Sequence, residues 1–277
     1  ICANQHLDGT AFERVEIAGP RFINFLLSPK WFAKVNLSVL EAGDSYGRTD
    51  FGKKEKVQGE FVSANPTGPM HMGNARGGAI GDCLAAVLDW SGHDVTREFY
   101  INDAGNQVEK FGKSLEARYL QIYLGEDAVE FPEDGYHGAD IGERAREFAE
   151  INGDRYLHAD SEERKNALVD FAMPRNIEKL KTDLASYRIQ YDVWFPESTL
   201  HHGAIADAIR KLTDRGMTYE KEGALWYKTT ENGGEKDEVL VRANGFPTYF
   251  AADIAYHYNK FAVRGFHRVI NVWGADH

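Results

Sequence analysis

The residues best suited to chemistry lie in one short segment that joins an apolar strand pattern to a helical pattern. The segment reads Ser63-Ala64-Asn65-Pro66-Thr67-Gly68-Pro69-Met70-His71-Met72-Gly73-Asn74. Its two prolines, Pro66 and Pro69, fix backbone angles, whereas Gly68 and Gly73 permit close approach of backbone or ligand. Rigid and permissive positions alternate in this way where a chain must turn tightly around a ligand.

His71 and Asn74 add two side-chain donors at the start of the helical pattern. A helix amino end presents unpaired N–H groups and a partial positive charge, which favour a bound phosphate. An imidazole there can add a hydrogen bond as charge develops on the phosphate. A histidine at a helix start is more often a cap or a core residue, but the surrounding prolines and glycines favour a nucleotide-binding turn.

The flanking patterns predict how this turn is positioned. Residues 57–63 alternate as a strand, and residues 94–101 form a second apolar and aromatic run. Between them, apolar residues recur at helical spacing at Ala79, Ile80, Leu84, Val87 and Leu88. A strand, a crossover helix and a second strand predict a parallel α/β sheet with the turn at its carboxyl edge, where open α/β folds bind ligands.

Five stretches of the chain resemble the arginyl-tRNA synthetases, a class I family. They are residues 60–76, residues 99–105, Tyr191-Asp192-Val193-Trp194 followed by Glu197-Ser198, residues 248–257, and Trp273-Gly274-Ala275-Asp276-His277. They occur in the order of the family and span nearly the whole chain. Asn74 stands where many class I synthetases have a second histidine, but an asparagine still donates to phosphate.

The resemblance implies an arginine–tRNA ligase that activates L-arginine with ATP to arginyl-adenylate and transfers it to tRNA(Arg) in translation. A guanidinium is a planar fork of donors, so its selection requires carboxylates. Glu197 and Asp253 are the candidates, and Tyr249 shares a helical face with Asp253. The resemblance assigns ATP to Pro69, His71, Gly73 and Asn74, and arginine to Glu60, Ser63, Asn65, His71, Glu197, Tyr249, Asp253 and Asp276. No metal site is expected, and whether Asp276 reaches the amino acid stays open.

The same comparison suggests a Rossmann-like nucleotide-binding sheet with a helical insertion, preceded by part of a small amino-terminal α/β domain. The expected divisions are a tRNA-contacting domain and linker at 1–56, the first half of the catalytic domain at 57–103, a connective insertion at 104–190 and the continuation of the catalytic domain at 191–277. The family implies a lysine loop and an anticodon-binding domain beyond residue 277. We therefore expect a fragment, truncated at both ends, with little activity alone.

Local patterns predict further elements. Strands are expected at 15–18 and 22–27, and a helix should start at Ser28-Pro29. A long helix should follow Asp103, and another should be capped at Ser161 and kinked at Pro174. A helix at 201–212, a hairpin pairing 225–227 with 239–241, and a helix starting near Thr248 complete the expectation.

Composition and charge agree with a globular protein. The 277 residues are 43% hydrophobic, no apolar stretch approaches a membrane span, and Cys2 and Cys83 are too few for a disulfide scaffold or a zinc cluster. The net charge of −11 disfavours indiscriminate nucleic-acid binding, whereas residues 1–56 carry a net charge of +1. We expect a cytoplasmic monomer that takes ATP with Mg²⁺ as a substrate and holds no tightly bound cofactor.

Two alternatives stay open at this point. A cysteinyl-type synthetase would need zinc-ligating thiols and should lack the paired acids. A non-catalytic RNA-binding or regulatory paralogue would use the fold as a scaffold. Binding of arginine, lysine and an ATP analogue would separate these interpretations.

Overall fold

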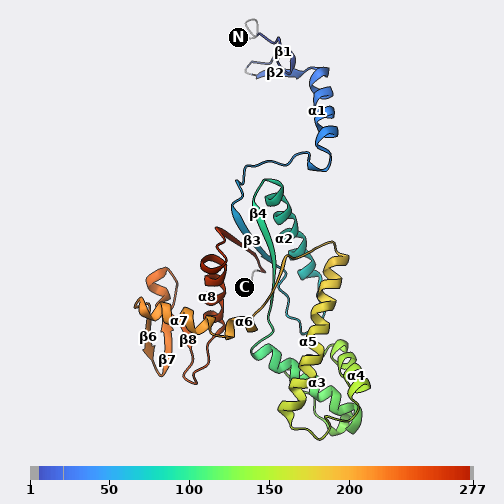
Figure 1. Cartoon of the computed structure of the whole chain (residues 1–277), viewed down its shortest axis with the longest axis vertical. Helices are drawn as coiled ribbons and strands as arrows, with labels where there is room; N and C mark the ends of the chain where they lie inside the picture. Colours follow the sequence, from blue (N-terminus) through green and yellow to red (C-terminus); the bar gives the residue numbers. More distant parts are fainter. Residues whose placement is uncertain (1–5, 21, 275–277) are drawn as a thin grey trace. The chain divides into compact units, whose positions relative to one another are not determined.

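The computed structural model describes residues 6–20 and 22–274, which form two compact units, Ile1–Asp50 and Phe51–His277 (Figure 1). The predicted role of Asp276 therefore concerns a residue outside the described ones. Within the described residues, no helix is long and apolar enough to span a membrane.

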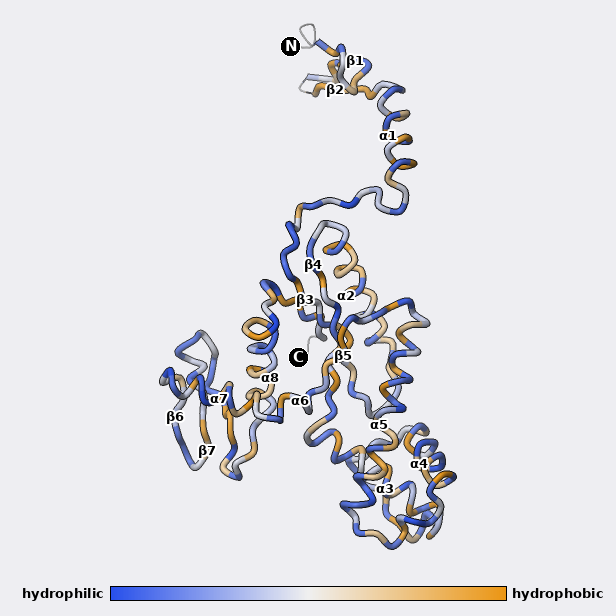
Figure 2. The backbone as a smooth tube through the Cα atoms, viewed as in Figure 1, coloured by the Kyte–Doolittle hydropathy of each residue, from blue (hydrophilic) through white to orange (hydrophobic). Residues whose placement is uncertain are grey.

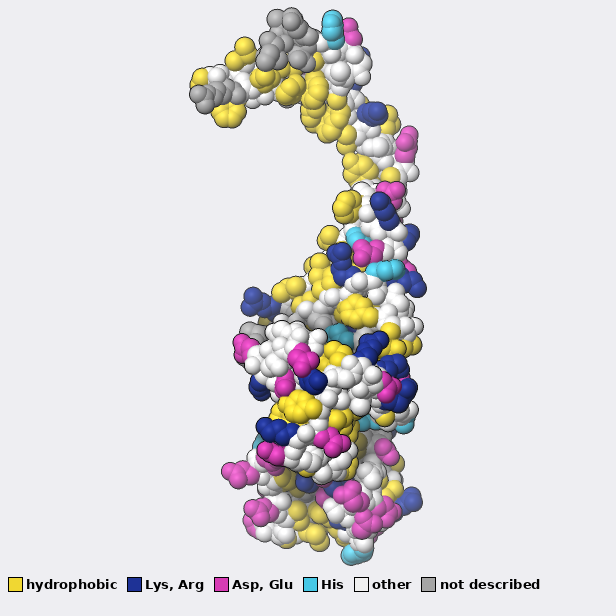
Figure 3. All heavy atoms as spheres, turned by 90° about the vertical axis from the view of Figure 1, so that its left-hand side faces the viewer, with side chains coloured by type: hydrophobic (Ala, Val, Ile, Leu, Met, Phe, Trp, Pro, Cys, Tyr) yellow, Lys and Arg dark blue, Asp and Glu magenta, His cyan; other side chains and the backbone are white. Residues whose placement is uncertain are grey.

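The first unit is small and buries little. Strands β1 (Phe12–Ala18) and β2 (Phe22–Leu27) pair antiparallel, and helix α1 (Pro29–Ala42) follows the N-cap Ser28. Both strands and the helix start are thus confirmed, although β1 begins earlier than predicted. Apolar and polar residues alternate along α1 (Figure 2), and yellow apolar side chains lie on the surface of this unit (Figure 3). No residue of α1 is buried, which is expected of a two-stranded hairpin with one helix.

The second unit is built on a four-stranded parallel sheet with the order β5-β4-β3-β9. Its strands are β3 (Lys56–Phe61), β4 (Asp94–Ile101), β5 (Val193–Pro196) and β9 (Arg268–Val272). Crossover helix α2 (Met72–Trp90) joins β3 to β4, which confirms the predicted strand, helix and strand. Strand β9 was not predicted. Strand β9 pairs with β3. It places residues 268–272 beside the strand that leads into residues 63–74, the predicted nucleotide-binding turn (the nucleotide turn).

Two glycines of α2 allow this helix to pack directly on the sheet. A Cβ atom on Gly81 would lie 2.2 Å from Phe61, and one on Gly78 would lie 2.8 Å from Ile189. On the same side, a buried cluster joins the sheet to the end of a long helix, with the members Phe61, Phe99, Ile101, Leu180, Leu184 and Ile189. The close helix packing fixes the amino end of α2 at the carboxyl edge of β3.

The helical insertion has a hydrophobic core of its own. Its helices are α3 (Asn106–Leu124), α4 (Ala139–Asn152) and α5 (Ser161–Ser186), with a short 3₁₀ helix at Glu126–Ala128. They share the buried residues Phe111, Leu115, Tyr119, Ile141, Ala145, Phe148, Leu168, Ala172 and Met173. The cap predicted at Ser161 was off by one residue, because the Asp160 side chain accepts from the Glu163 N–H. Helix α5 continues through Pro174.

The remaining elements follow β5. They are α6 (Ser198–His201), α7 (Ala204–Asp214), β6 (Thr218–Lys221), β7 (Ala224–Tyr227), a 3₁₀ helix at Thr229–Asn232, β8 (Glu238–Val241), α8 (Tyr249–Tyr258) and a π-helical turn, η5 (Asn259–Val263). The hairpin of β7 and β8 and the helix start near Thr248, which is the N-cap of α8, are confirmed. The single helix predicted at 201–212 was wrong, since Gly203, at φ 110°, separates α6 from α7. Strand β6, which extends the hairpin to three strands, was not predicted.

Candidate functional site

The nucleotide turn begins with a strained backbone. Val62 and Ser63, directly after β3, have φ values of 68° and 41°, in the left-handed region that β-branched residues avoid. The Tyr191 hydroxyl donates to the Phe61 carbonyl at 2.9 Å, and the Tyr100 N–H donates to the Ser63 hydroxyl at 3.1 Å. Neighbouring strands therefore hold the chain at the point where it leaves the sheet.

His71 and Asn74 form a reciprocal cap at the amino end of α2. The His71 Nδ1 accepts from the Gly73 N–H at 3.1 Å, and the Asn74 Oδ1 accepts from the His71 N–H at 2.9 Å. An accepting Nδ1 carries no proton, so a neutral His71 ring bears its proton on Nε2. The cap and the phosphate-binding role are compatible, because the cap leaves the His71 Nε2–H and the Asn74 amide nitrogen free to donate.

Gly73 is required by this cap. A Cβ atom on Gly73 would lie 2.9 Å from the imidazole of His71, which would push the ring away from the backbone. The other predicted ATP-binding residue, Pro69, is exposed in the middle of the turn. Pro69 thus restricts the backbone of the turn, and Gly73 allows the His71 ring to pack against the start of α2. Both residues contribute to the conformation of the turn.

Glu197 is a buried carboxylate at the carboxyl end of β5, with an exposed fraction of 3%. Its Oε1 lies 3.4 Å from His201 Nε2, and it accepts a hydrogen bond from the Tyr100 phenol. With the Asn102 amide turned to satisfy its neighbours, that amide donates to Glu197 Oε2 at 3.1 Å. Burial raises the pKa of Glu197, and the contacts with His201 and Tyr100 partly offset this rise.

Asp253 and Tyr249 come from the first turns of α8 and are both half-exposed. Asp253 Oδ1 lies 3.3 Å from His257 Nδ1, and the Tyr249 hydroxyl lies beside Gly105. Burial raises the pKa of the Tyr100 phenol, and the charges of Glu197, Glu60 and Asp253 raise it further. The charges of Glu197 and Asp253 therefore both act on Tyr100.

Glu60, the third acid, already has a cationic partner. Its Oε2 accepts from Lys260 Nζ at 2.6 Å, and its Oε1 accepts from the Ser63 hydroxyl at 3.1 Å. Lys260, in η5, is 0% exposed and also donates to Asn271 Oδ1 at 3.2 Å. Lys260 thus neutralises Glu60, whereas Glu197 and Asp253 pair with histidines and have no lysine or arginine partner within residues 6–20 and 22–274.

A second buried ion pair extends this polar face of the sheet. Glu98, opposite Glu60 in the β3–β4 register, accepts from Arg264 at 2.5 Å and from the Tyr256 hydroxyl. Like Lys260, Arg264 follows α8. The π-helical turn η5 and the residue that directly follows it thus supply the cations that balance the charge of two buried glutamates.

Several of these residues were missed by sequence reasoning. Asp103 accepts from the Ser198 N–H at 2.8 Å and from its hydroxyl at 2.7 Å, which fixes the segment that carries Glu197. Lys260 lies seven residues after Asp253, a spacing that places two residues on one face of a helix. This spacing could have suggested Lys260 as a site residue. Asn65, in contrast, is exposed, with its Oδ1 3.2 Å from the Asn102 amide.

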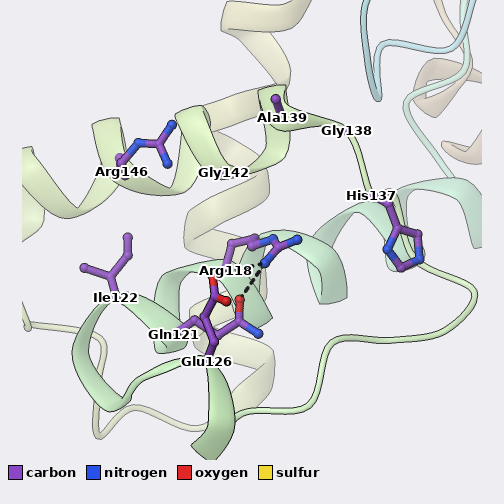
Figure 4. A pocket seen from close by; sticks show the side chains of 9 residues that line it. All are labelled: Arg118, Gln121, Ile122, Glu126, His137, Gly138, Ala139, Gly142 and Arg146. Atoms are coloured by element: carbon purple, nitrogen blue, oxygen red, sulfur yellow. Dashed lines mark hydrogen bonds and ion pairs between the residues drawn. The ribbon is translucent and has the colours of Figure 1, made fainter.

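A separate cavity of about 310 Å³ lies in the helical insertion (Figure 4). It is lined by Arg118, Gln121, Ile122, Glu126, His137, Gly138, Ala139, Gly142 and Arg146. Arg118 is turned toward Gln121, to which it donates at 2.9 Å, and Glu126 lies 4.0 Å away. The predicted site residues do not line this cavity.

Comparison with known proteins connects this geometry to a family. Residues 36–276 match the family model described as tRNA synthetases class I (R), catalytic domain. The arginine–tRNA ligases of Ruminiclostridium cellulolyticum and Caldanaerobacter subterraneus are each 60% identical over 278 aligned positions, which cover 100% of this chain and 49% of each relative. The chain thus spans about half the length of the curated relatives it matches.

Solved structures that resemble this chain are described as members of the same family. A structure described as an arginyl-tRNA synthetase from Campylobacter jejuni matches with a TM-score of 0.82 at 34% identity, over 91% of this chain and 54% of that one. The Thermus thermophilus arginyl-tRNA synthetase matches with a TM-score of 0.56 at 24% identity, over 91% and 42% of the two chains, and supports the fold.

Proposed function

Because this chain belongs to the class I arginyl-tRNA synthetases, we propose that it binds L-arginine and ATP and forms arginyl-adenylate, the first step of an arginine–tRNA ligase. The observation that supports this proposal is the buried carboxylate of Glu197 at the carboxyl end of β5, which the Asn102 amide connects to Asn65 of the nucleotide turn. Two carboxylates beside a phosphate-binding helix end suit a substrate with a cationic side chain and a reaction with a triphosphate.

In the proposed complex, Glu197 and Asp253 accept hydrogen bonds from the guanidinium, and Tyr249 closes the pocket beside them. Hydrogen bonds from Tyr100 and Asn102 orient the Glu197 carboxylate, so it is held in position before the ligand binds. The Ser63 backbone and Asn65 would hold the α-amino group, and Asp276 is a further proposed contact. Glu60 would act through its charge-neutral pair with Lys260.

The phosphates of ATP would lie at the amino end of α2. The His71 Nε2–H and the Asn74 amide nitrogen would donate to them, and Pro69 and Gly73 would shape the approach. The arginine carboxylate attacks the α-phosphate, its oxygen forms the new P–O bond, and pyrophosphate leaves with the bridging oxygen. Positioning and charge stabilisation carry the step, so no protein nucleophile is needed. Mg²⁺ would enter the site bound to the phosphates of ATP.

Transfer of arginine to tRNA(Arg) is the second proposed step. The names of the relatives support it, and the residues 1–56 and 104–190 are the proposed tRNA-contacting domain and connective insertion. We also propose that the enzyme acts as a monomer in the cytoplasm.

Calorimetric titration tests the proposal. The chain should bind arginine and an ATP analogue, and it should discriminate against lysine by about 10⁴, because a site built for paired hydrogen bonds rejects a ligand that leaves them unmade. The substitution Asp253→Asn should weaken arginine binding and leave binding of the ATP analogue largely unchanged. Equal affinity for arginine and lysine would refute the pocket, and a chain that binds none of the three would be a scaffold.

A further inference from the structure

The strained start of the nucleotide turn requires support from outside the turn. Unfavourable backbone angles such as those of Val62 and Ser63 persist only when the surrounding structure holds them. The contacts of Tyr191 and Tyr100 hold the first side of the turn, at the end of β3. The second side, toward His71, needs its own contact.

Asn176, in the middle of α5, supplies that contact. Its exposed fraction is 8%, and its Nδ2 donates to the Pro66 carbonyl at 2.9 Å, across 110 residues of chain. Among the described residues, Asn176 is the one side chain that hydrogen-bonds the backbone of residues 64–70. Pro66 is itself buried and has no N–H, so its carbonyl is the group by which the backbone can be fixed at this position.

Arg144 of α4 fixes the orientation of the Asn176 amide. Arg144 Nε donates to Asn176 Oδ1 at 2.9 Å, while its NH1 donates to Glu147 at 2.5 Å. With the amide oxygen held by a cation, the amide nitrogen must face Pro66. A Cβ atom on Gly68 would lie 3.6 Å from Asp140 of α4, so α4 and α5 both border the turn.

We propose that Asn176 is a positioning residue for the nucleotide turn, held in place by Arg144, so that the helical insertion sets where the His71 donor meets the phosphates. This inference rests on the proposed function of the turn. The physical reason is that Pro66 and Pro69 make residues 66–71 stiff. A displacement of the Pro66 carbonyl is therefore passed to the amino end of α2 instead of being absorbed by local rotation.

The substitution Asn176→Asp tests this role in the full chain, because it keeps the volume and the oxygen that faces Arg144 but removes the donor to Pro66. The matched control is Asn166→Asp, the same chemical change at an exposed position of α5. We expect the Kd for a non-hydrolysable ATP analogue to rise about tenfold in Asn176→Asp, and the Kd for arginine to stay within about twofold. Both affinities should be unchanged in Asn166→Asp.

A purely structural role would lower both affinities in proportion, and that result would overturn the inference, as would an unchanged nucleotide affinity. If Asn176→Asp fails to fold, Arg144→Gln is the second variant, because it frees the amide without removing the donor. It should raise the nucleotide Kd by about threefold and spare arginine, and an unchanged nucleotide Kd would overturn the inference. A wild-type chain that binds arginine but no nucleotide would overturn the proposed role of the turn, and the inference with it.

Discussion

The nucleotide turn and the proposed arginine pocket, which we assign to Glu60, Glu197, Tyr249 and Asp253, differ in how they are stabilised. The cap of the turn is local, because His71 and Asn74 satisfy each other's backbone within one helical turn and remain accessible. The pocket depends on distant residues, since Lys260 reaches Glu60 across 200 residues and Arg264 reaches Glu98 across 166. One region is built from adjacent residues, the other from the two ends of the catalytic unit.

This difference follows from the charge that each region must hold. A phosphate site can be built from the backbone N–H donors of a helix end, which need no buried charge to balance them. A guanidinium site needs carboxylates, and a buried carboxylate is tolerated only with a partner. We therefore expect substitutions behind the pocket to affect folding, and substitutions in the turn to affect mainly nucleotide binding.

The largest expected effect is on stability, in Lys260→Met. Methionine fills a similar volume but leaves Glu60 buried without a cation, which should cost about 3–5 kcal/mol in the free energy of unfolding. Urea unfolding followed by circular dichroism measures it. The same substitution at Lys179, whose pair with Asp183 is exposed on α5, should cost less than about 1 kcal/mol.

A double variant sharpens this test. Adding Glu60→Gln to Lys260→Met removes the unpaired charge and should restore much of the lost stability, because the cost arises from the isolated carboxylate. Equal losses in Lys260→Met and Lys179→Met would contradict the claim that buried charge pairs stabilise the back of the pocket.

The next effect is on arginine affinity, in Glu197→Gln. The amide keeps the shape of the side chain but loses one charge-assisted contact with the guanidinium, so the Kd for arginine should rise about 10-fold to 100-fold. Titration calorimetry measures it, with Glu150→Gln at an exposed position of α4 as the control. An unchanged arginine affinity would assign Glu197 to structure alone.

The contrast between the two regions also explains what the sequence could predict. The turn, the strands on either side of it and the helix α2 follow from local periodicity and from prolines and glycines. The buried pairs could not be predicted in this way, because nothing in the residues around Lys260 or Arg264 indicates which glutamate they meet. Strand β9 was missed for the same reason, since this five-residue segment, with the sequence RVINV, acquires its partner β3 only in the folded chain.

Local features that the sequence analysis did not use also set two helix boundaries. The helix expected at 201–212 is broken by the left-handed Gly203, and the cap of α5 is Asp160 instead of Ser161. Glu197 and Asp253 were proposed from a family resemblance. The contact of α8 with β4, in which the rings of Tyr256 and Tyr100 lie 4.6 Å apart, is a long-range contact that no local pattern contains.

A smaller effect separates the two functions of His71. Asparagine is a good N-cap, so His71→Asn should leave stability nearly unchanged, whereas His71→Ala should cost about 1 kcal/mol because the cap is lost. Both variants remove the Nε2 donor and should weaken binding of an ATP analogue by a similar factor. Thermal unfolding and calorimetry together measure this. If His71→Asn keeps full nucleotide affinity, His71 is only a cap.

The smallest effect is a pH dependence at the rim of the pocket. The hydrogen bond with Asp253 raises the pKa of His257 above its ordinary value of about 6.5, against burial and the charge of Lys260. A group with a raised pKa in the folded state stabilises fully below its unfolded pKa, and this contribution is lost as pH rises through the folded pKa.

The difference in unfolding free energy between the wild type and Asp253→Asn should therefore be larger at about pH 5.5 than at about pH 8.5. Because the Asp253 side chain is half-exposed, the change should stay below about 1 kcal/mol and shrink in high salt. Urea midpoints at the two pH values measure it. A change as large as that of Lys260→Met would mean that the pair of Asp253 and His257 is as strongly buried as the pair of Glu60 and Lys260. It would contradict the assignment of Asp253 and His257 to the exposed rim of the proposed pocket.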